Sequence, residues 1–156
     1  MLITDLITVE RIICGAVADS TQRALDQLGE LLATGQPSLS ADEIATSLIE
    51  REALCSTGLN RCVAIPHGRL KGCVRATGAF LKLEQGVDFN AADRQPVDML
   101  FAFIVPENHI EEHLEILSLL AHLFSDRELC AQLRRCTQAS GVFELLTHWQ
   151  AQHAPA

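Results

Sequence analysis

The chain has 156 residues, of which 48% are hydrophobic and 21% are charged, so it is long enough to bury a core and is not disordered. Its formal net charge of −8 argues against nucleic acid or an anionic membrane as a partner. No basic leader precedes Asp5, and the longest uncharged apolar run, residues 99–105, is too short to span a bilayer. We therefore expect a cytoplasmic protein without membrane insertion, folded as one domain over residues 1–156.

The chain is predicted to open with a strand and a helix. The β-branched run at residues 11–17 is typical of a strand. Ser20 is expected to cap the helix that follows, which ends before Gly35 and Pro37. The apolar positions of this helix repeat with the helical period, and they are Leu25, Leu28, Leu31 and Leu32.

A second helix is predicted from Ser40 to about Glu52. Ser40 and Glu43 have the spacing of a capping box, and Ile44, Leu48 and Ile49 form the apolar face of the helix. The irregular stretch at residues 53–62 then leads into a short strand-like run that stops at Pro66.

The second half of the chain is predicted to contain two strands and three helices. Residues 74–84 alternate as a strand does, and residues 96–106 form the nearly continuous apolar run of a strand covered on both faces. Turn-forming residues separate these two strands. Helices are expected at 109–124 with Asn108 as cap, at 126–136, and at 140–149. Helices on both sides of a short sheet indicate a layered α/β domain.

The segment VAIPHGR, residues 63–69, holds the candidate for chemistry. Pro66 fixes its own φ and favours an extended Ile65, which makes a stiff approach to His67. Gly68 has no side chain, so a phosphoryl group or a protein can come close to His67. A neutral imidazole is a competent nucleophile towards phosphorus near pH 7.

Phosphoryl transfer also needs groups that position and neutralise the phosphate. Arg51, at the end of the second predicted helix, can reach forward to the segment. Ser56, Thr57 and Gly58 offer hydroxyl and backbone N–H groups. The alternative for Arg51 is a solvated cation at a helix end, and the residues alone leave both interpretations open.

The other histidines have simpler interpretations. The helical period places His113 on one face with Leu117, Leu120 and Phe124, and His122 on the opposite side. His113 is therefore expected to face the sheet and His122 to face water. Periodicity alone favours a core role for His113. His148 and His153 are expected at the surface.

Two patterns suggest a metal site. HIEEH, residues 109–113, matches the H-x-x-E-H pattern of one class of zinc proteases, but a third ligand is not evident. Cys62 and Cys73 flank His67 without the spacing of a zinc module. The six cysteines include no CxxC pair and are expected as reduced, mostly buried thiols, so no metal site is predicted.

Four segments together resemble a known family. They are REALCSTG at 51–58, AIPHGR at 64–69, PVDMLFAFIVP at 96–106 and EHLEILSLLA at 112–121. Over a stretch from about Leu6 to Leu146, the chain is similar to the fructose/mannitol-type enzyme IIA proteins of the bacterial phosphoenolpyruvate-dependent phosphotransferase system. It resembles most closely their nitrogen-related, regulatory branch.

The resemblance implies a three-layer α/β/α domain with a small mixed sheet flanked by helices. It implies that Nε2 of His67 accepts a phosphoryl group from a histidine phosphocarrier protein, and that Arg51 and His113 hold that group. With them, the hydroxyl of Thr57 and the open backbone at Gly68 complete the expected phosphate-binding set.

The chain departs from the family pattern just before the active segment. Asn60-Arg61-Cys62 stands where family members commonly have glycine, which is expected to stiffen the loop and to affect how a partner docks. Cys62, close to His67, is interpreted as a small apolar filler rather than a redox sensor.

Two functions remain open at this point. In the first, phosphocarrier chemistry serves a mainly regulatory protein, and the phosphorylation state of His67 controls which target proteins bind. In the alternative, a sugar-transport enzyme IIA passes the phosphate to a separate IIB component. The sequence holds no IIB or IIC segment after Trp149, which favours the first. Neither is expected to need a cofactor, because the pocket donors supply the charge stabilisation.

Overall fold

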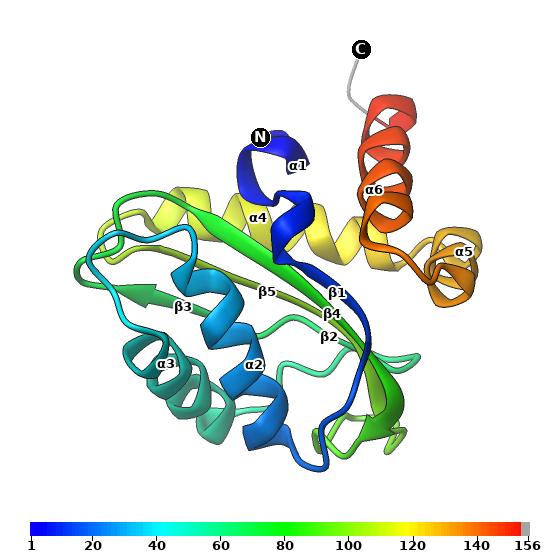
Figure 1. The fold of residues 1–156 in the computed structure, drawn as a ribbon, viewed down its shortest axis with the longest axis horizontal. Helices are drawn as coiled ribbons and strands as arrows, with labels where there is room; N and C mark the ends of the chain where they lie inside the picture. The colour runs from blue at the N-terminus through cyan, green and yellow to red at the C-terminus, as the bar shows by residue number, and fades with distance from the viewer. Residues whose placement is uncertain (154–156) are drawn as a thin grey trace.

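A five-stranded mixed sheet forms the middle layer of the computed structural model, which describes residues 1–153 (Figure 1). The strands are β1 (Ile12–Ala16), β2 (Val63–Ala64), β3 (His67–Leu70), β4 (Thr77–Val87) and β5 (Val97–Pro106). Their order is β1-β4-β5-β2, and β3 also pairs with β5. β4 and β5 are antiparallel, whereas β1 runs parallel to β4, and β2 and β3 run parallel to β5.

β2 and β3 lie end to end along the same side of β5. Val63 of β2 pairs with Met99, and His67 of β3 pairs with Phe103, so the register continues unbroken across the two residues between the strands. The carbonyl of Pro66 still accepts a hydrogen bond from the Phe103 N–H, at 3.1 Å. His67 therefore begins the second half of an interrupted edge strand, whereas the sequence suggested that it follows the strand's end.

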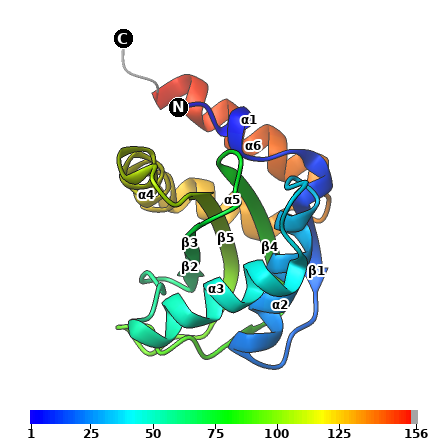
Figure 2. The same cartoon turned by 90° about the vertical axis from the view of Figure 1, so that its left-hand side faces the viewer.

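Helices cover both faces of the sheet (Figures 1 and 2). One face carries α2 (Thr21–Ala33) and α3 (Ala41–Leu54), which pack on each other and on the sheet. The opposite face carries α1 (Ile3–Leu6), α4 (Ile110–Phe124), α5 (Arg127–Arg135) and α6 (Ala139–His153). The predicted three-layer α/β/α architecture is confirmed.

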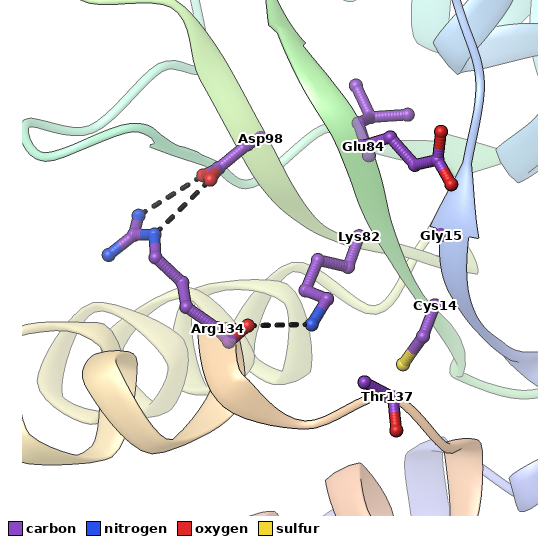
Figure 3. Close-up of a pocket in the computed structure, with 8 residues that line it drawn as sticks. Cys14, Gly15, Lys82, Glu84, Asp98, Arg134 and Thr137 are labelled. Carbon is purple, nitrogen blue, oxygen red and sulfur yellow. Dashed lines mark hydrogen bonds and ion pairs between the residues drawn. The ribbon is translucent and has the colours of Figure 1, made fainter.

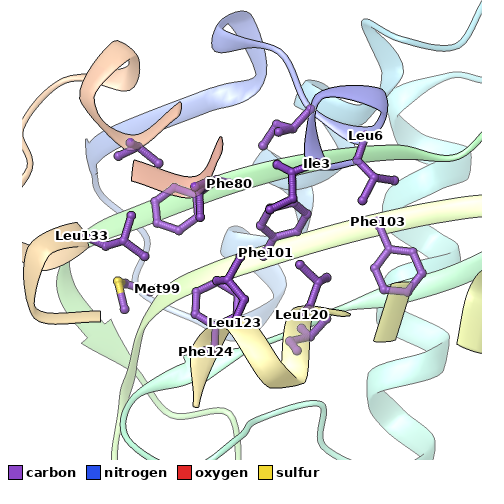
Figure 4. Packing of buried hydrophobic residues seen from close by; sticks show 14 of the residues in the cluster. Ile3, Leu6, Phe80, Met99, Phe101, Phe103, Leu120, Leu123, Phe124 and Leu133 are labelled. Carbon is purple, nitrogen blue, oxygen red and sulfur yellow. The ribbon is translucent and has the colours of Figure 1, made fainter. Parts of the chain in front are cut away.

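The alternation of side chains along β5 supplies both hydrophobic cores. Phe101 and Phe103 point to the face covered by α4, where they pack with Phe80, Leu120 and Leu123 (Figure 4). The residues that alternate with them point to the face covered by α2 and α3, and they are Leu100, Ala102 and Ile104. β5 is thus buried on both sides, as its continuous apolar run predicted.

Helix starts were predicted with mixed success. The Ser20 side chain caps α2 by accepting from the Arg23 N–H, and Ser40 forms the expected capping box at α3. Asn108 does not cap α4: the N-cap position is His109, without a side-chain cap hydrogen bond. The short α1 and the 3-10 helix η1 (Val9–Arg11) were not predicted, because such short turns carry no periodic signal.

Within residues 1–153, no helix is both long enough and apolar enough to cross a membrane. Met99 to Val105, the longest apolar run of the sequence, belongs to β5 and is fully buried in the sheet.

Candidate functional site

His67 is the first residue of β3 and points to the face that α4 covers. Its ring stacks on that of Phe103, with centroids 5.5 Å apart and an interplanar angle of 15°. It meets the ring of His113 edge-on at a centroid distance of 5.0 Å. Only 7% of His67 is exposed, so the imidazole is held on two sides by aromatic rings.

One ring nitrogen of His67 is fixed by the backbone. Nδ1 lies 2.7 Å from the carbonyl oxygen of Ile65, which can only accept, so Nδ1 carries the proton and donates. Burial lowers the pKa of His67, and the charge of Arg51 lowers it further, against the opposing effect of the Ile65 bond. At neutral pH the ring is therefore uncharged, and Nε2 keeps its lone pair.

His113 lies in the first turn of α4 and faces the sheet, as the helical period predicted. Its ring meets that of Phe103 at 5.5 Å. Burial, the neighbouring His67 and the charges of Arg69 and Arg51 lower the pKa of His113 to about 4. Its Nδ1 is buried and finds no hydrogen-bond partner among the described residues. The contact with His67 places His113 in the site and not in an isolated core.

Arg51 lies in the last turn of α3, which packs on the opposite face of the sheet from α4. Its Nη1 donates to the carbonyl of Cys55 at 2.7 Å, and the side chain is half-buried. Its positive charge contributes to the lowered pKa of both His67 and His113, so the guanidinium lies near enough to both rings to act on their charge. Two uncharged imidazoles beside a fixed cation form a site suited to an anion.

The hydroxyl of Thr57, expected as a phosphate donor, is already engaged. It donates to Oε1 of Glu52 at 2.5 Å, and the Thr57 N–H donates to Oε2 of the same carboxylate at 2.7 Å. Thr57 must leave Glu52 to reach a phosphate, so its phosphate-binding role stays a prediction. Glu52 was not predicted from the sequence, since an acidic residue near a helix end usually faces solvent.

The structure gives a different reason for a glycine at position 68 from the one expected. A Cβ atom at this position would lie 2.8 Å from Oγ of Ser47, on α3. Side chains alternate along a strand, so residue 68 faces α3 while His67 faces α4. The glycine permits close packing of the edge strand on α3. A part for its backbone in binding phosphate stays a prediction.

The loop before β2 contains two consecutive residues in the left-handed region. Arg61 has φ 68° and Cys62 has φ 69°, a conformation that glycine adopts without penalty. The Arg61 N–H donates to Oδ2 of Asp93 at 2.9 Å, and its carbonyl accepts from Nη2 of Arg134 at 2.8 Å. These bonds hold the conformation at the position where the family commonly has glycine.

Exposed apolar side chains stand next to the site residues on both helices. Leu54, at the end of α3 after Arg51, is 83% exposed. On α4, Ile110 and Leu114 flank His113 and are 54% and 60% exposed. Exposed apolar groups of this size beside a polar site are typical of a surface that another protein covers.

A hollow of about 550 Å³ lies away from His67, between β1, β4, β5 and α5 (Figure 3). Three of its charged groups, those of Lys82, Arg134 and Asp98, are already paired. The Lys82 ammonium donates to three carbonyl groups at the end of α5, those of Leu133, Arg134 and Cys136. Nη2 of Arg134 lies 3.2 Å from Oδ1 of Asp98. Nothing in the sequence indicated this hollow.

The residues of the suggested metal patterns have other surroundings. His109 is exposed and lies 3.0 Å from Oε1 of Glu112, whereas His113 contacts His67. In residues 1–153, no three His, Cys, Asp or Glu side chains are grouped so that they could hold a metal ion. All six cysteines are unpaired, but only Cys73 and Cys130 are buried, so the expectation of mostly buried thiols is wrong.

Comparison with known proteins identifies relatives over most of the chain. Residues 5–149 match the family described as phosphoenolpyruvate-dependent sugar phosphotransferase system, EIIA 2. A nitrogen regulatory protein of Klebsiella oxytoca is 40% identical over 129 residues, 82% of this chain and 79% of that protein. One from Pseudomonas aeruginosa is 37% identical over 145 residues, 93% and 94% of the two chains. The crystal structure of nitrogen regulatory protein IIA-Ntr from Neisseria meningitidis has a TM-score of 0.88 and 39% identity, and the match covers 93% of this chain and 99% of that chain.

Proposed function

The chain belongs to the EIIA 2 family of the phosphoenolpyruvate-dependent sugar phosphotransferase system, and from this premise we propose that it is a regulatory phosphoryl acceptor. His67 receives a phosphoryl group from a histidine phosphocarrier protein, and the phosphorylation state of His67 controls which proteins bind. The similarity to nitrogen regulatory proteins over most of the chain supports this regulatory role.

The transfer follows from the state of the His67 ring. The lone pair of Nε2 attacks the phosphorus of the donor's phosphohistidine, a new N–P bond forms, and the donor's N–P bond breaks. Its electron pair returns to the donor imidazole. The proton of His67 stays on Nδ1, where the Ile65 carbonyl accepts its hydrogen bond and stabilises the positive charge that develops on the ring.

Three side chains around His67 can hold the transferred phosphoryl group and balance its negative charge. Arg51 can form two parallel hydrogen bonds with phosphoryl oxygens, and the neutral His113 can donate one. Arg69, exposed on the same strand, adds positive charge beside them. Charge stabilisation by fixed donors is the main requirement of phosphoryl transfer.

The observation that carries the proposal is the hydrogen bond from Nδ1 of His67 to the Ile65 carbonyl, together with the contact between His67 and His113. A histidine kept only for packing has no need of a fixed tautomer with a free Nε2. The exposed Leu54, Ile110 and Leu114 supply an apolar rim on which the phosphocarrier or a target protein can dock.

Intact-protein mass spectrometry tests the proposal. The protein is incubated with phosphoenolpyruvate, enzyme I and a histidine phosphocarrier protein, beside His67→Ala and the surface control His122→Ala. We expect an acid-labile gain of one phosphoryl group in the wild type and in His122→Ala, and none in His67→Ala. A gain that persists in His67→Ala would move the acceptor to another residue.

The alternative role in sugar transport is separated by a second measurement. The phosphorylated protein is mixed with a fructose-type IIB component, and the loss of its phosphoryl group is followed over time. Rapid, complete transfer to IIB would favour transport. A stable phosphoprotein would support the regulatory function.

A further inference from the structure

A chain of hydrogen bonds runs from the end of α3 to the ring of His67. Glu52 accepts two bonds from Thr57, one from its N–H and one from its hydroxyl. The carbonyl of Thr57 accepts from the Ile65 N–H at 3.1 Å. The carbonyl of Ile65 in turn accepts from Nδ1 of His67 at 2.7 Å. Each residue in the chain fixes the next.

The Ile65 carbonyl needs this support because of Pro66. It belongs to the Ile65–Pro66 peptide, which has no N–H and therefore cannot be fixed by a donated hydrogen bond of its own. Its orientation depends on the bonds on either side. These are the Ile65 N–H bond to Thr57 and the Phe103 N–H bond to the Pro66 carbonyl. The first of these two leads back to Glu52.

Both oxygens of the Glu52 carboxylate take part in this chain of hydrogen bonds. Its two oxygens each take one bond from Thr57, which is 8% exposed. Within residues 1–153 Glu52 forms no salt bridge, and its neighbour Arg51 donates to the Cys55 carbonyl instead. Hydrogen bonds to an ionised carboxylate are stronger than those between neutral groups, so this pair is a firm anchor for the loop.

We propose that Glu52 is a positioning residue for phosphoryl acceptance. By holding Thr57, it sets the Ile65 carbonyl that keeps the His67 proton on Nδ1 and leaves Nε2 free to attack phosphorus. Glu52 touches neither the phosphoryl group nor the partner in this scheme. The inference rests on the function proposed above, because it assigns Glu52 a part in that same reaction.

The tautomer of His67 is the first readout, and it needs no phosphorylation. In Glu52→Gln the side-chain amide presents a donor to one of the two Thr57 donors, so one of the two bonds is lost. We expect the ring ¹⁵N spectrum of His67 at neutral pH to show the Nδ1–H form in the wild type and a growing share of the Nε2–H form in Glu52→Gln. The control is Glu50→Gln, an exposed position on the same helix.

The kinetics of phosphoryl acceptance are the second readout. We expect kcat of Glu52→Gln to fall roughly 10-fold, by analogy with the loss when the outer hydrogen-bond partner of a metal-bound histidine is removed. KM for the phosphocarrier should stay unchanged, and Glu50→Gln should match the wild type. A wild-type tautomer and a wild-type kcat in Glu52→Gln would overturn the proposal, even if the variant is less stable.

Two further variants keep the test decisive if Glu52→Gln does not fold. Thr57→Val removes the hydroxyl bond and keeps the N–H bond, whereas Thr57→Ser keeps both. A tautomer shift in Thr57→Val but not in Thr57→Ser supports the proposal, and no shift in either rejects it. If the wild type accepts no phosphoryl group from any carrier, the proposed function fails, while the tautomer measurement still decides the role of Glu52.

Discussion

His113 enters the site as a neutral ring, because burial, the neighbouring His67 and the charges of Arg69 and Arg51 hold its pKa at about 4. A phosphoryl group on His67 brings negative charge close to this ring, which raises the pKa of a histidine. His113 is therefore the side chain whose protonation responds most directly to the phosphorylation state. Its buried Nδ1 has no hydrogen-bond partner within residues 1–153, so no neighbouring acceptor in that part of the chain holds a proton on this atom.

The low pKa of His113 predicts a pH-dependent stability. Between about pH 4 and 6.5, the folded protein keeps this ring neutral while the unfolded chain binds a proton. The unfolded state is therefore favoured as the pH falls through this window, and the free energy of unfolding decreases. Urea unfolding at pH 7 and pH 5 should show a smaller decrease in His113→Gln than in the wild type. An equal decrease in both would show that other groups cause it, and the exposed His122→Gln is the control.

Arg51 is the second residue whose role is open to direct test. Arg51→Ala should lower the rate of phosphoryl acceptance on the order of 100-fold, the usual loss when one fixed donor to a developing anion is removed. Arg51→Lys should recover only part of the rate, because an ammonium cannot make the two parallel bonds. Rapid-quench kinetics with a phosphocarrier measure both. A wild-type rate in Arg51→Ala would remove Arg51 from the site.

Among the elements, the edge strand formed by β2 and β3 brings the site together. Its residues alternate between the α3 face and the α4 face, so His67 meets His113 on one side while Gly68 packs against Ser47 on the other. Ile65 turns its N–H and its carbonyl to the outer edge of this strand, where the N–H donates to Thr57 and the carbonyl accepts from His67. The free edge of the strand thus orients the ring of His67.

Packing at Gly68 should tolerate an added methyl group only if the Ser47 side chain turns away. In Gly68→Ala the new Cβ meets Oγ of Ser47 at 2.8 Å, and moving the serine hydroxyl to a less favoured rotamer costs about 0.5–1.5 kcal/mol of unfolding free energy. Ser47→Ala removes that oxygen, so the double variant should recover most of the loss. Chemical denaturation of the four proteins in the cycle measures the coupling. Additive effects would place the cost of Gly68→Ala elsewhere.

In the loop before β2, a substitution is expected to raise the free energy of unfolding. Arg61 has φ 68°, which costs a non-glycine residue about 1–2 kcal/mol. Arg61→Gly removes this cost but adds freedom to the unfolded chain, worth about 0.4–1 kcal/mol. We expect a net gain of about 0.5 kcal/mol in unfolding free energy by urea denaturation. Asn60→Gly, at an exposed neighbour without positive φ, should lose stability instead, and a loss in both would contradict the argument.

For the molecule as a whole, β5 joins the two hydrophobic cores. It is buried on both faces and has paired strands on both edges, so its amides open only when the protein unfolds globally. Hydrogen exchange should be slowest at Phe101 and Ala102. It should be faster in β1, which lies at a sheet edge with Ile13 partly exposed. Faster exchange in β5 than in β1 would contradict this picture.

The parts of the fold with local signals were predictable from the sequence. The capping box at Ser40, the apolar run of β5 and the helical face of His113 each depend on near neighbours in the chain, and the structure confirms them. The cap at Asn108 was wrong, because His109 occupies the N-cap position.

The parts of the site that depend on distant residues were not predictable. The stack of His67 on Phe103 arises from the register between β3 and β5, which no single segment encodes. Glu52 was missed because its partner Thr57 lies beyond the helix end, where an acidic residue normally faces water. The packing of Gly68 against Ser47 likewise follows from how α3 docks on the edge strand.

His67, the proposed nucleophile, lies at the edge of the sheet, so the site depends on the helices of both faces. Arg51 belongs to the layer of α2 and α3, His113 belongs to the layer of α4, and His67 stands at the seam between them. If either layer comes away from the sheet, Arg51 or His113 leaves the site before the chain unfolds completely. Under the proposed function, phosphoryl acceptance therefore reports that both layers are docked, because a molecule with one layer displaced lacks part of its expected phosphate-binding set.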